Sequence, residues 1–269
     1  MKRGFLEATT LQFTRALTRA LLSEQTARLP GLLQSLDPRV RLVGLLMLVL
    51  AATISRRITV VAGLFALALV IALLSKVRIA TLVTRVWLVV LAFTGVIALP
   101  AIFVTPGHPV ATLGTVTITE QGLRTAALLL LRVETAVTFT TLLVLCTPWT
   151  HVLKALRALR LPKEAITMLA MTHRYVFLLV ETANQMVESR RSRTVGILKP
   201  GQQRHVAART AGVLLSKSVG LSNEVYLAMQ SRGFRGEVHV LSDFRMTMWD
   251  YCGLLAFLLA AGIAVWIGR

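Results

Sequence analysis

The sequence predicts an all-α, polytopic membrane protein with about five transmembrane helices and a helical cytoplasmic domain. Hydrophobic residues make up 55% of the 269 residues and the mean hydropathy is +0.69, which is more apolar surface than one soluble core of that size buries. The formal net charge is +18, and basic stretches alternate with uninterrupted apolar segments. Because the cytoplasmic loops of membrane proteins are enriched in Lys and Arg, this pattern favours a membrane protein over a nucleic-acid binder.

An N-terminal arm, residues 1–35, is predicted to lie along the membrane surface. Its apolar positions Leu6, Phe13, Leu17 and Leu21 recur at roughly helical spacing among basic side chains, as in an interfacial amphipathic helix. The same basic side chains interrupt the apolar core that a cleavable signal peptide needs, so we expect the arm to be retained. A flexible leader with accidental periodicity is the alternative.

The transmembrane helices are predicted within residues 36–147 and, for the last one, within 247–269. Crossing about 30 Å of hydrocarbon takes about 20 helical residues. Five apolar runs approach that length: 41–55, 58–75, 87–104, 126–147 and 248–267. The first two runs are separated by Ser55, Arg56 and Arg57 alone, so we expect a tight helical hairpin, with a re-entrant pair as the alternative.

The distribution of basic residues predicts the orientation of the chain. Residues 105–123 contain no Lys or Arg, whereas residues 148–246 are rich in both. The positive-inside rule therefore places the first stretch outside and the second in the cytoplasm, together with the N-terminus. Arg269 then lies outside, and Arg56 and Arg57 are an exception in a short outer turn.

Two charged residues fall inside the fourth predicted span. Arg132 and Glu134 either pair with polar groups of neighbouring helices or of a partner subunit, or else Arg132 reaches the outer interface and Glu134 faces a wet crevice. At the start of the first span, Asp37 is expected to cap the helix and Pro38 to occupy its first position. Capping is expected to be a sufficient explanation for these two residues.

Residues 148–246 are predicted to form a helical cytoplasmic domain attached to the membrane, because they are helical in pattern but too charged to cross a bilayer. A short amphipathic helix ends near Pro162, which can also open the helix that follows. That helix is expected over about 163–193, a length of about 46 Å at 1.5 Å per residue. After a break, a second long helix is expected over about 205–230, with Gly233 suited to terminate it.

Each long helix ends in an arginine between small residues. The two tripeptides are Ser192-Arg193-Thr194 and Ser231-Arg232-Gly233. Small neighbours leave the guanidinium unobstructed, so its planar set of donors can enter a narrow acidic or carbonyl-lined groove on a partner. The alternative is that Arg193 and Arg232 only cap helix C-termini, where a cation offsets the helix dipole by about 0.3–1 kcal/mol. From the residues alone, both interpretations stay open.

The chain resembles the transmembrane T component of energy-coupling factor (ECF) transporters from about Leu36 to its end. The stretches that carry the resemblance are LDPRVRLV, LRVETAVTFTTLL, LRALRLPKEAITMLAMTHRYVFLLVETANQM, SRRSRT and YLAMQSRGFRG. The resemblance implies a scaffold that couples two ATP-binding-cassette (ABC) ATPase subunits to a separate substrate-binding membrane (S) subunit. It also implies that two long cytoplasmic coupling helices end in Ala-Arg-Gly-like tripeptides, whose arginines dock in grooves of the ATPase subunits.

By position, the resemblance assigns one coupling motif to Ser192, Arg193 and Thr194 and the other to Ser231, Arg232 and Gly233. Serine replaces alanine in both motifs, and Thr194 stands where many relatives have glycine. Because Arg190 and Arg191 precede the first motif, registers centred on either of them stay open. Phe234, directly after the second motif, is counted as a supporting residue.

Two stretches of the sequence bear on the substrate. THRYVFLLVETANQM and MQSRGFRGE are closer to the T components dedicated to cobalt or nickel than to the shared modules for vitamins. The resemblance therefore implies uptake of cobalt or nickel ions across a bacterial or archaeal inner or plasma membrane, with this chain as a multi-pass subunit. A shared T component for B-vitamin uptake is the alternative.

Catalysis and metal binding by this chain itself are not expected. The sequence has no Gly-rich G-x-x-x-x-G-K-[ST] loop and no nucleophile with a neighbouring base, so ATP and Mg²⁺ are expected on the partner ATPase chains. The histidines have no ligand partner three or four residues away, and the cysteines are expected to pack rather than to bind metal. We therefore expect no cofactor on this chain and assign the metal ion to the S subunit.

Two other classes of protein are alternatives. A stand-alone secondary transporter or channel would use polar residues near the membrane midplane, with Arg132, Glu134 and Pro100 as its best candidates. It predicts transport by the purified chain alone in vesicles, whereas a T component is inactive without its partners. A membrane-tethered nucleic-acid binder is disfavoured, because the basic domain lacks interleaved aromatic residues and any known module.

Overall fold

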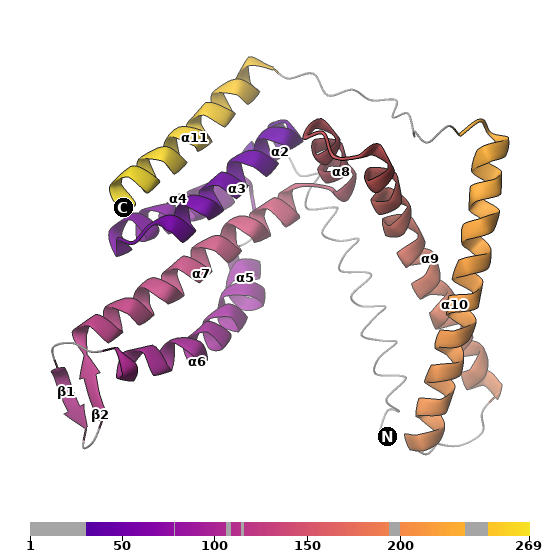
Figure 1. Cartoon of the computed structure of the whole chain (residues 1–269), viewed down its shortest axis with the longest axis horizontal. Helices are drawn as coiled ribbons and strands as arrows, with labels where there is room; N and C mark the ends of the chain where they lie inside the picture. The colour runs from indigo at the N-terminus through magenta and orange to yellow at the C-terminus, as the bar shows by residue number, and fades with distance from the viewer. Residues whose placement is uncertain (1–30, 78, 106–108, 114–115, 194–199, 235–246) are drawn as a thin grey trace. The chain divides into compact units, whose positions relative to one another are not determined.

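The computed structural model describes residues 31–77, 79–105, 109–113, 116–193, 200–234 and 247–269. Over these residues the chain is helical apart from one two-stranded hairpin (Figure 1). The predicted N-terminal arm, up to Pro30, lies outside the described residues. The described residues divide into two compact units, which we call the apolar bundle (within 31–155, and 247–269) and the helix-pair unit (within 156–234).

The apolar bundle contains most of the elements. Its helices are α2 Leu32–Ser35, α3 Pro38–Ile54, α4 Ile58–Leu74, α5 Ile79–Leu82, the π-helix η1 Val83–Trp87, α6 Leu88–Val104, α7 Glu120–Cys146 and α11 Met248–Gly268. Between α6 and α7, β1 (Pro109–Leu113) pairs antiparallel with β2 (Val116–Thr119). This hairpin is absent from the sequence-based prediction, although its valines and threonines are residues that favour strands.

The core of the apolar bundle lies where α3 packs against α7 and α11. Leu48, Phe139 and Leu142 are fully buried there. The helices α3 and α11 approach so closely at Gly44 that a β-carbon at this position would collide with the ring of Phe257. Small residues at such crossings allow membrane helices to pack by close van der Waals contact, so the sequence of α3 fits a lipid-embedded bundle.

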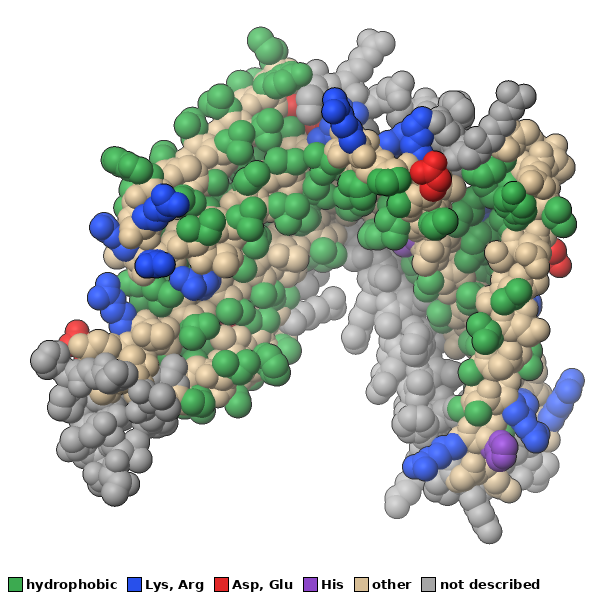
Figure 2. Space-filling view, in the orientation of Figure 1, with side chains coloured by type: hydrophobic (Ala, Val, Ile, Leu, Met, Phe, Trp, Pro, Cys, Tyr) green, Lys and Arg blue, Asp and Glu red, His purple; other side chains and the backbone are tan. Residues whose placement is uncertain are grey.

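Several helices of the bundle have the character of membrane segments. Of the described helices, α7 and α11 are long and apolar enough to cross a membrane, and α4 and the Leu88–Pro100 part of α6 are shorter apolar helices. Hydrophobic side chains spread over the outer surface of this unit (Figure 2). On α11, Trp249 and Trp266 are 81% and 83% exposed and lie about 26 Å apart along the helix axis. Because tryptophans favour the two interfaces of a bilayer, this spacing fits a spanning helix, while the count of five spans stays a prediction.

Both ends of α3 are fixed by short-range contacts. The predicted cap is confirmed, because Pro38 is the first residue of α3 and the Asp37 carboxylate accepts a hydrogen bond of 2.8 Å from the Arg39 N–H. At the other end, the predicted three-residue connection joins α3 to α4. Within that connection, the N–H of Arg56 donates to the carbonyl of Gly268 at 2.8 Å, which ties the turn to the end of α11.

The helix-pair unit is built from α9, Lys163–Arg193, and α10, Pro200–Ser231. The predicted bounds of the first long helix are confirmed. The second long helix begins at Pro200 instead of at 205, because proline fits the first position of a helix, where its missing N–H is not needed. The predicted short amphipathic helix is α8, Trp149–Ala158, and the chain passes within it from the apolar bundle into the helix-pair unit, after Ala155.

Candidate functional site

The second predicted motif closes the C-terminal end of α10. Gly233 has a φ of +80°, in the left-handed region that glycine adopts without strain. Its N–H donates to the carbonyl of Gln230 at 2.9 Å, and the N–H of Phe234 donates to the carbonyl of Met229 at 3.0 Å. These two bonds form a Schellman cap, which satisfies the last carbonyls of a helix. The prediction that Gly233 terminates this helix is confirmed.

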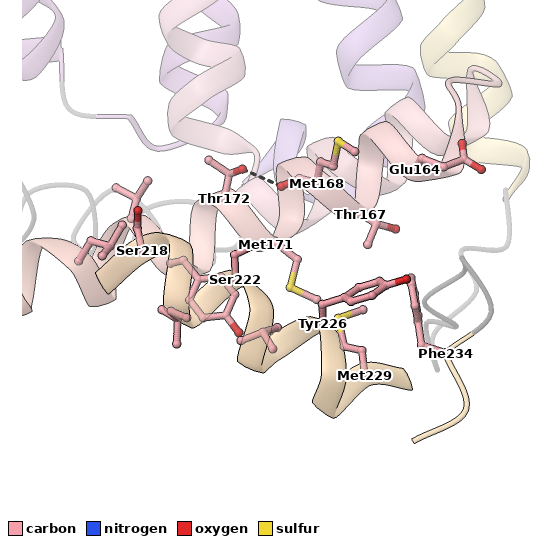
Figure 3. Close-up of a pocket in the computed structure, with 15 residues that line it drawn as sticks. Glu164, Thr167, Met168, Met171, Thr172, Ser218, Ser222, Tyr226, Met229 and Phe234 are labelled. Carbon is pink, nitrogen blue, oxygen red and sulfur yellow. Dashed lines mark hydrogen bonds between the residues drawn. The ribbon is translucent and has the colours of Figure 1, made fainter. Parts of the chain in front are cut away.

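The two residues that flank Gly233 differ in their surroundings. Phe234 is half-buried and, with Met229, lines a groove beside α10 (Figure 3). Arg232 is exposed, as are Ser231 and Gly233 next to it. The hydroxyl of Ser231 donates to a carbonyl of its own helix at 2.9 Å. It therefore leaves the guanidinium of Arg232 available to a partner. Arg232 therefore stands at a slim helix tip.

The first predicted motif lies at the end of α9. Ser192 and Arg193 are the last two residues of this helix, and both are exposed. The hydroxyl of Ser192 donates to a carbonyl of the preceding turn at 2.9 Å, which repeats the arrangement of the serine at the other tip. Thr194 lies outside the described residues. Arg190 and Arg191, the centres of the alternative registers, belong to the last turn of α9.

A groove of about 600 Å³ runs between α9 and α10 (Figure 3). Thioether and aromatic side chains form much of its wall: Met168, Met171, Tyr175, Tyr226, Met229 and Phe234. Met168 is 68% exposed and Tyr226 is 54% exposed. Thr172 turns its hydroxyl to its own helix, donating to the Met168 carbonyl at 2.7 Å. Exposed apolar surface of this kind is typical of surfaces where proteins bind partners, ligands or lipid.

The two charged residues in the apolar part of α7, Arg132 and Glu134, have different surroundings. Nη2 of Arg132 donates to the carbonyl of Ser55 at 2.7 Å, so the guanidinium is bonded to the turn between α3 and α4. Glu134 is 7% exposed, and neither of its carboxylate oxygens has a hydrogen-bond partner among the described residues. Within the bundle, Glu134 is thus enclosed and does not face an open crevice.

A polar cluster at the start of α3 was not found by sequence reasoning. Asp250 is 5% exposed, and its Oδ1 accepts a hydrogen bond of 2.6 Å from the N–H of Asp37. Its Oδ2 accepts from the N–H and the hydroxyl of Thr247, at 2.8 and 2.7 Å. One carboxylate therefore joins the first turn of α11 to the cap of α3. Capping alone is not a sufficient explanation for Asp37, which also takes part in this contact.

Arg41 is the buried cation of the same cluster, at 3% exposed, while the less buried Arg39 forms an ion pair of 4.0 Å with Asp37. Nη1 of Arg41 donates to the carbonyl of Cys146 at 2.7 Å, its Nε to that of Leu36 at 2.9 Å and its Nη2 to that of Gln34 at 3.4 Å. The guanidinium thus closes the C-terminal end of α7, where the last carbonyls have no donors within their own helix. The signal in the sequence is a charged residue one turn into an apolar span, which is costly unless it has a function.

Among the described residues, no group of three or more His, Cys, Asp or Glu side chains is arranged to hold a metal ion. Both cysteines are free thiols, with Cys146 buried and Cys252 exposed. Among the described residues, the two arginine tips and the groove between their helices are exposed and can contact other molecules. The polar cluster is internal to the apolar bundle.

Comparison with known proteins relates the chain to a transport family. The family model described as "CbiQ: Cobalt transport protein" matches residues 31–240. An uncharacterized protein of Methanocaldococcus jannaschii, MJ1571, is 29% identical over 274 residues, which cover 100% of this chain and 94% of that protein. The cobalt transport protein CbiQ of Rhodobacter capsulatus is 29% identical over 147 residues, which cover 53% of this chain and 60% of that protein.

Proposed function

Because this chain belongs to the cobalt transport protein family, we propose that it is the scaffold of a membrane complex for cobalt uptake. In this complex it acts as the T component of an ECF transporter. It couples two ABC ATPase subunits, which bind ATP and Mg²⁺, to an S subunit that binds the metal ion. The chain itself transmits motion. It neither hydrolyses ATP nor binds the metal ion.

The observation that carries the proposal is the exposed arginine at each long helix end, Arg193 on α9 and Arg232 on α10. In the part of the chain that the structure describes, neither arginine forms an ion pair. An exposed guanidinium offers five donors in a planar fork, which suits a groove lined by carboxylates or carbonyls. Each tip would occupy such a groove on one ATPase subunit, with its serine and glycine or threonine neighbours leaving the entry clear.

The length of the two helices suits the transmission of motion. α9 has 31 residues and α10 has 32, which corresponds to about 46–48 Å each. Packed helices respond to small displacements by moving as rigid elements, because their interfaces have discrete arrangements. A shift of the ATPase grooves on nucleotide binding would therefore move the whole of α9 and α10, and ATP binding would be linked to transport through this chain.

The groove between α9 and α10 supports a membrane protein as the second partner. Its methionines are unbranched and adapt to several shapes, which suits an apolar helix that changes position during transport. Thioether and aromatic groups are poor ligands for a cobalt ion, which binds better to nitrogen and oxygen donors. Burying these groups against an apolar helix gains free energy through the hydrophobic effect. We therefore assign this groove to the S subunit.

In this proposal the S subunit binds cobalt, and the same role of this chain is compatible with nickel or a B vitamin as the substrate. A nickel-binding or vitamin-binding S subunit would change the cargo but would leave the role of this chain unchanged. The chain would be a multi-pass protein of the inner or plasma membrane, with its N-terminus and both arginine tips in the cytoplasm. Identification of the proteins that co-purify with it distinguishes among these substrates.

The experiment that tests the proposal reverses the charge at each tip. In the complex of this chain with its ATPase and S subunits, Arg193→Glu and Arg232→Glu are made singly and together. A carboxylate in a groove that fits a guanidinium is repelled, so each single variant should weaken ATPase co-purification by about tenfold, or about 1.4 kcal/mol. The double variant should lose both co-purification and cobalt uptake.

Lys217→Glu is the matched control, because it makes the same change of charge at an exposed position of α10 away from the tip. It should leave co-purification and uptake unchanged. Intact co-purification and uptake in the double variant would contradict the proposed role of the tips. Cobalt transport by the purified chain alone in vesicles would instead indicate a stand-alone secondary transporter or channel.

A further inference from the structure

Within the described residues, two places where the chain passes between the apolar bundle and the helix-pair unit lie next to one polar cluster. The chain leaves the bundle within α8, after Ala155, and belongs to the bundle again at Thr247, the cap residue of α11. α8 closely follows Cys146, whose carbonyl is bound by Arg41. α11 follows its cap residue Thr247, which is bound by Asp250. At its bundle end, each link is therefore held by a buried charged residue.

Asp37 connects these two attachments. Its N–H donates to Asp250 at 2.6 Å, while its own carboxylate caps α3. Asp37 and Asp250 are 6% and 5% exposed, and both interact electrostatically with Arg41. Arg41 is therefore near enough to both carboxylates to interact with them electrostatically in a water-poor environment, where the loss of one charge leaves the others less compensated. The three residues act as a single unit.

The first turn of α8 also lies beside this cluster. Burial, together with the nearby Arg41 and Lys154 cations, holds the pKa of His151 below its usual value, and Asp37 acts in the opposite direction. Farther along the same helix, Leu153 is buried. α8 therefore starts as a part of the bundle and continues, as one helix, into the helix-pair unit.

We propose that Asp37, Arg41 and Asp250 form the joint through which motion of α9 and α10 enters the apolar bundle. The inference rests on the coupling function proposed above. By holding the starts of α8 and α11 to α3 and α7, the joint makes a force on either link displace the bundle instead of unravelling a helix end. These are positioning residues, since they act through the segments that they hold.

The end of α7 shows why such a joint is needed. Pro148 prevents the helix from continuing, because proline has no N–H to donate and its ring clashes with the preceding turn. The last carbonyls of α7 are then without intrahelical donors, and such ends fray easily. Arg41 supplies a donor from another helix, so the C-terminal end of α7 is fixed to α3 at the point where the chain departs for α8.

The other end of α3 provides a matched control. Nη2 of Arg132 donates to the carbonyl of Ser55 at 2.7 Å, the same distance as that from Arg41 to the carbonyl of Cys146. Ser55 begins the short connection between α3 and α4, which stays within the apolar bundle. Replacing either arginine therefore removes a bond to the carbonyl at a helix end, although Arg41 also donates to Leu36 and Gln34. Arg41 alone of the two lies at a link to the helix-pair unit.

The test uses the complete complex, with its ATPase and S subunits, reconstituted in proteoliposomes. Asp250→Asn, Arg41→Gln and the control Arg132→Gln are compared by ATPase co-purification, ATP hydrolysis and cobalt uptake. We expect the two joint variants to retain the ATPase subunits and to hydrolyse ATP, while cobalt uptake per ATP falls by at least about fivefold, the lower end of coupling effects between sites. Arg132→Gln should leave this ratio unchanged. The ratio does not depend on the amount of folded complex, so a merely structural role would not alter it.

An unchanged ratio in both joint variants, or an equal fall in Arg132→Gln, would overturn the proposal. If the joint variants do not assemble, Thr247→Ala is the milder change, because it removes one hydroxyl donor to Asp250 and keeps the backbone donor. A lowered ratio in that variant supports the joint and an unchanged ratio contradicts it. A native chain that does not bind ATPase subunits overturns the coupling function together with the joint, and this is seen before any variant is made.

Discussion

Two pairs of arginines in this chain use the same chemical group in opposite ways. Arg41 and Arg132 each donate to a backbone carbonyl within the apolar bundle at 2.7 Å. Arg193 and Arg232 are exposed at the ends of α9 and α10, and form no ion pair among the described residues. A guanidinium inside the fold must have its donors satisfied there, whereas an exposed one can offer them to a partner. The environment of each arginine, which composition does not reveal, separates the structural ones from those available for recognition.

The largest expected effect is on the free energy of unfolding, where the buried and the exposed arginines should differ most. The variants that test this difference are Arg41→Ala and Arg232→Ala. Arg41→Ala leaves the buried carbonyl of Cys146 and the half-buried carbonyl of Leu36 without their donors. An unsatisfied buried group costs about 1–3 kcal/mol, so the free energy of unfolding should fall by about 1–4 kcal/mol. Arg232→Ala should change it by less than about 0.5 kcal/mol, as for an exposed substitution. Unfolding of the purified chains in detergent, followed by circular dichroism, measures both.

The same two variants should show the reverse order in assembly. Arg232→Ala should weaken association with the ATPase subunits, while Arg41→Ala should leave association per folded molecule unchanged. Equal losses of stability in the two variants would show that exposure does not separate the two kinds of arginine in this chain.

A smaller effect is expected at the backbone of the recognition tip. Gly233→Ala places a β-carbon at a φ of +80°, which costs about 1–2 kcal/mol in the left-handed region. The cap that holds Arg232 should then be less populated by about 5–30-fold, and ATPase association should weaken accordingly. Gly220→Ala, within α10 and with open space around a β-carbon, should stabilise the helix by about 0.5–1 kcal/mol. Weaker association in both variants would point to a general disturbance of α10.

Local patterns in the sequence were sufficient to predict the helix ends that carry the exposed arginines. The long helix over 163–193 is visible in its periodicity, and Gly233 is recognisable as a terminator because only its own backbone conformation is involved. The start of α10 was misplaced, since Pro200 can either break a helix or begin one. The hairpin over 109–119 was missed, because the search for apolar runs does not detect short strands.

The surroundings of the buried arginines depend on contacts between residues far apart in the chain. Asp37 and Asp250 are separated by 213 positions, and Arg41 and Cys146 by 105. Sequence reasoning explained Asp37 by its local cap and did not consider Arg41, because the free carbonyl at the end of α7 becomes its acceptor only after the helices pack. Polar groups that complete a fold in this way are visible in the three-dimensional arrangement and not in a motif.

The smallest expected effect depends on pH and lies at the polar cluster. Burial, with Arg41 and Lys154 nearby, lowers the pKa of His151, and Asp37 opposes this shift. The unfolded chain therefore binds the proton more readily than the folded chain. The contribution of His151 to stability is complete above its unfolded pKa of about 6.5 and is lost as the pH falls through the lower folded value. We expect the Tm of the purified chain to fall as the pH is lowered from about 7.5 to about 5.

His151→Asn should make this dependence of Tm on pH shallower, because the titrating group is gone. Arg41→Gln should also make it shallower, since removal of one nearby cation brings the pKa of His151 closer to its usual value. Lys154→Gln removes the other cation and should act in the same direction. An equal fall of Tm in the native chain and in His151→Asn would assign the pH dependence to other groups, and would remove the electrostatic evidence that α8 starts beside Arg41.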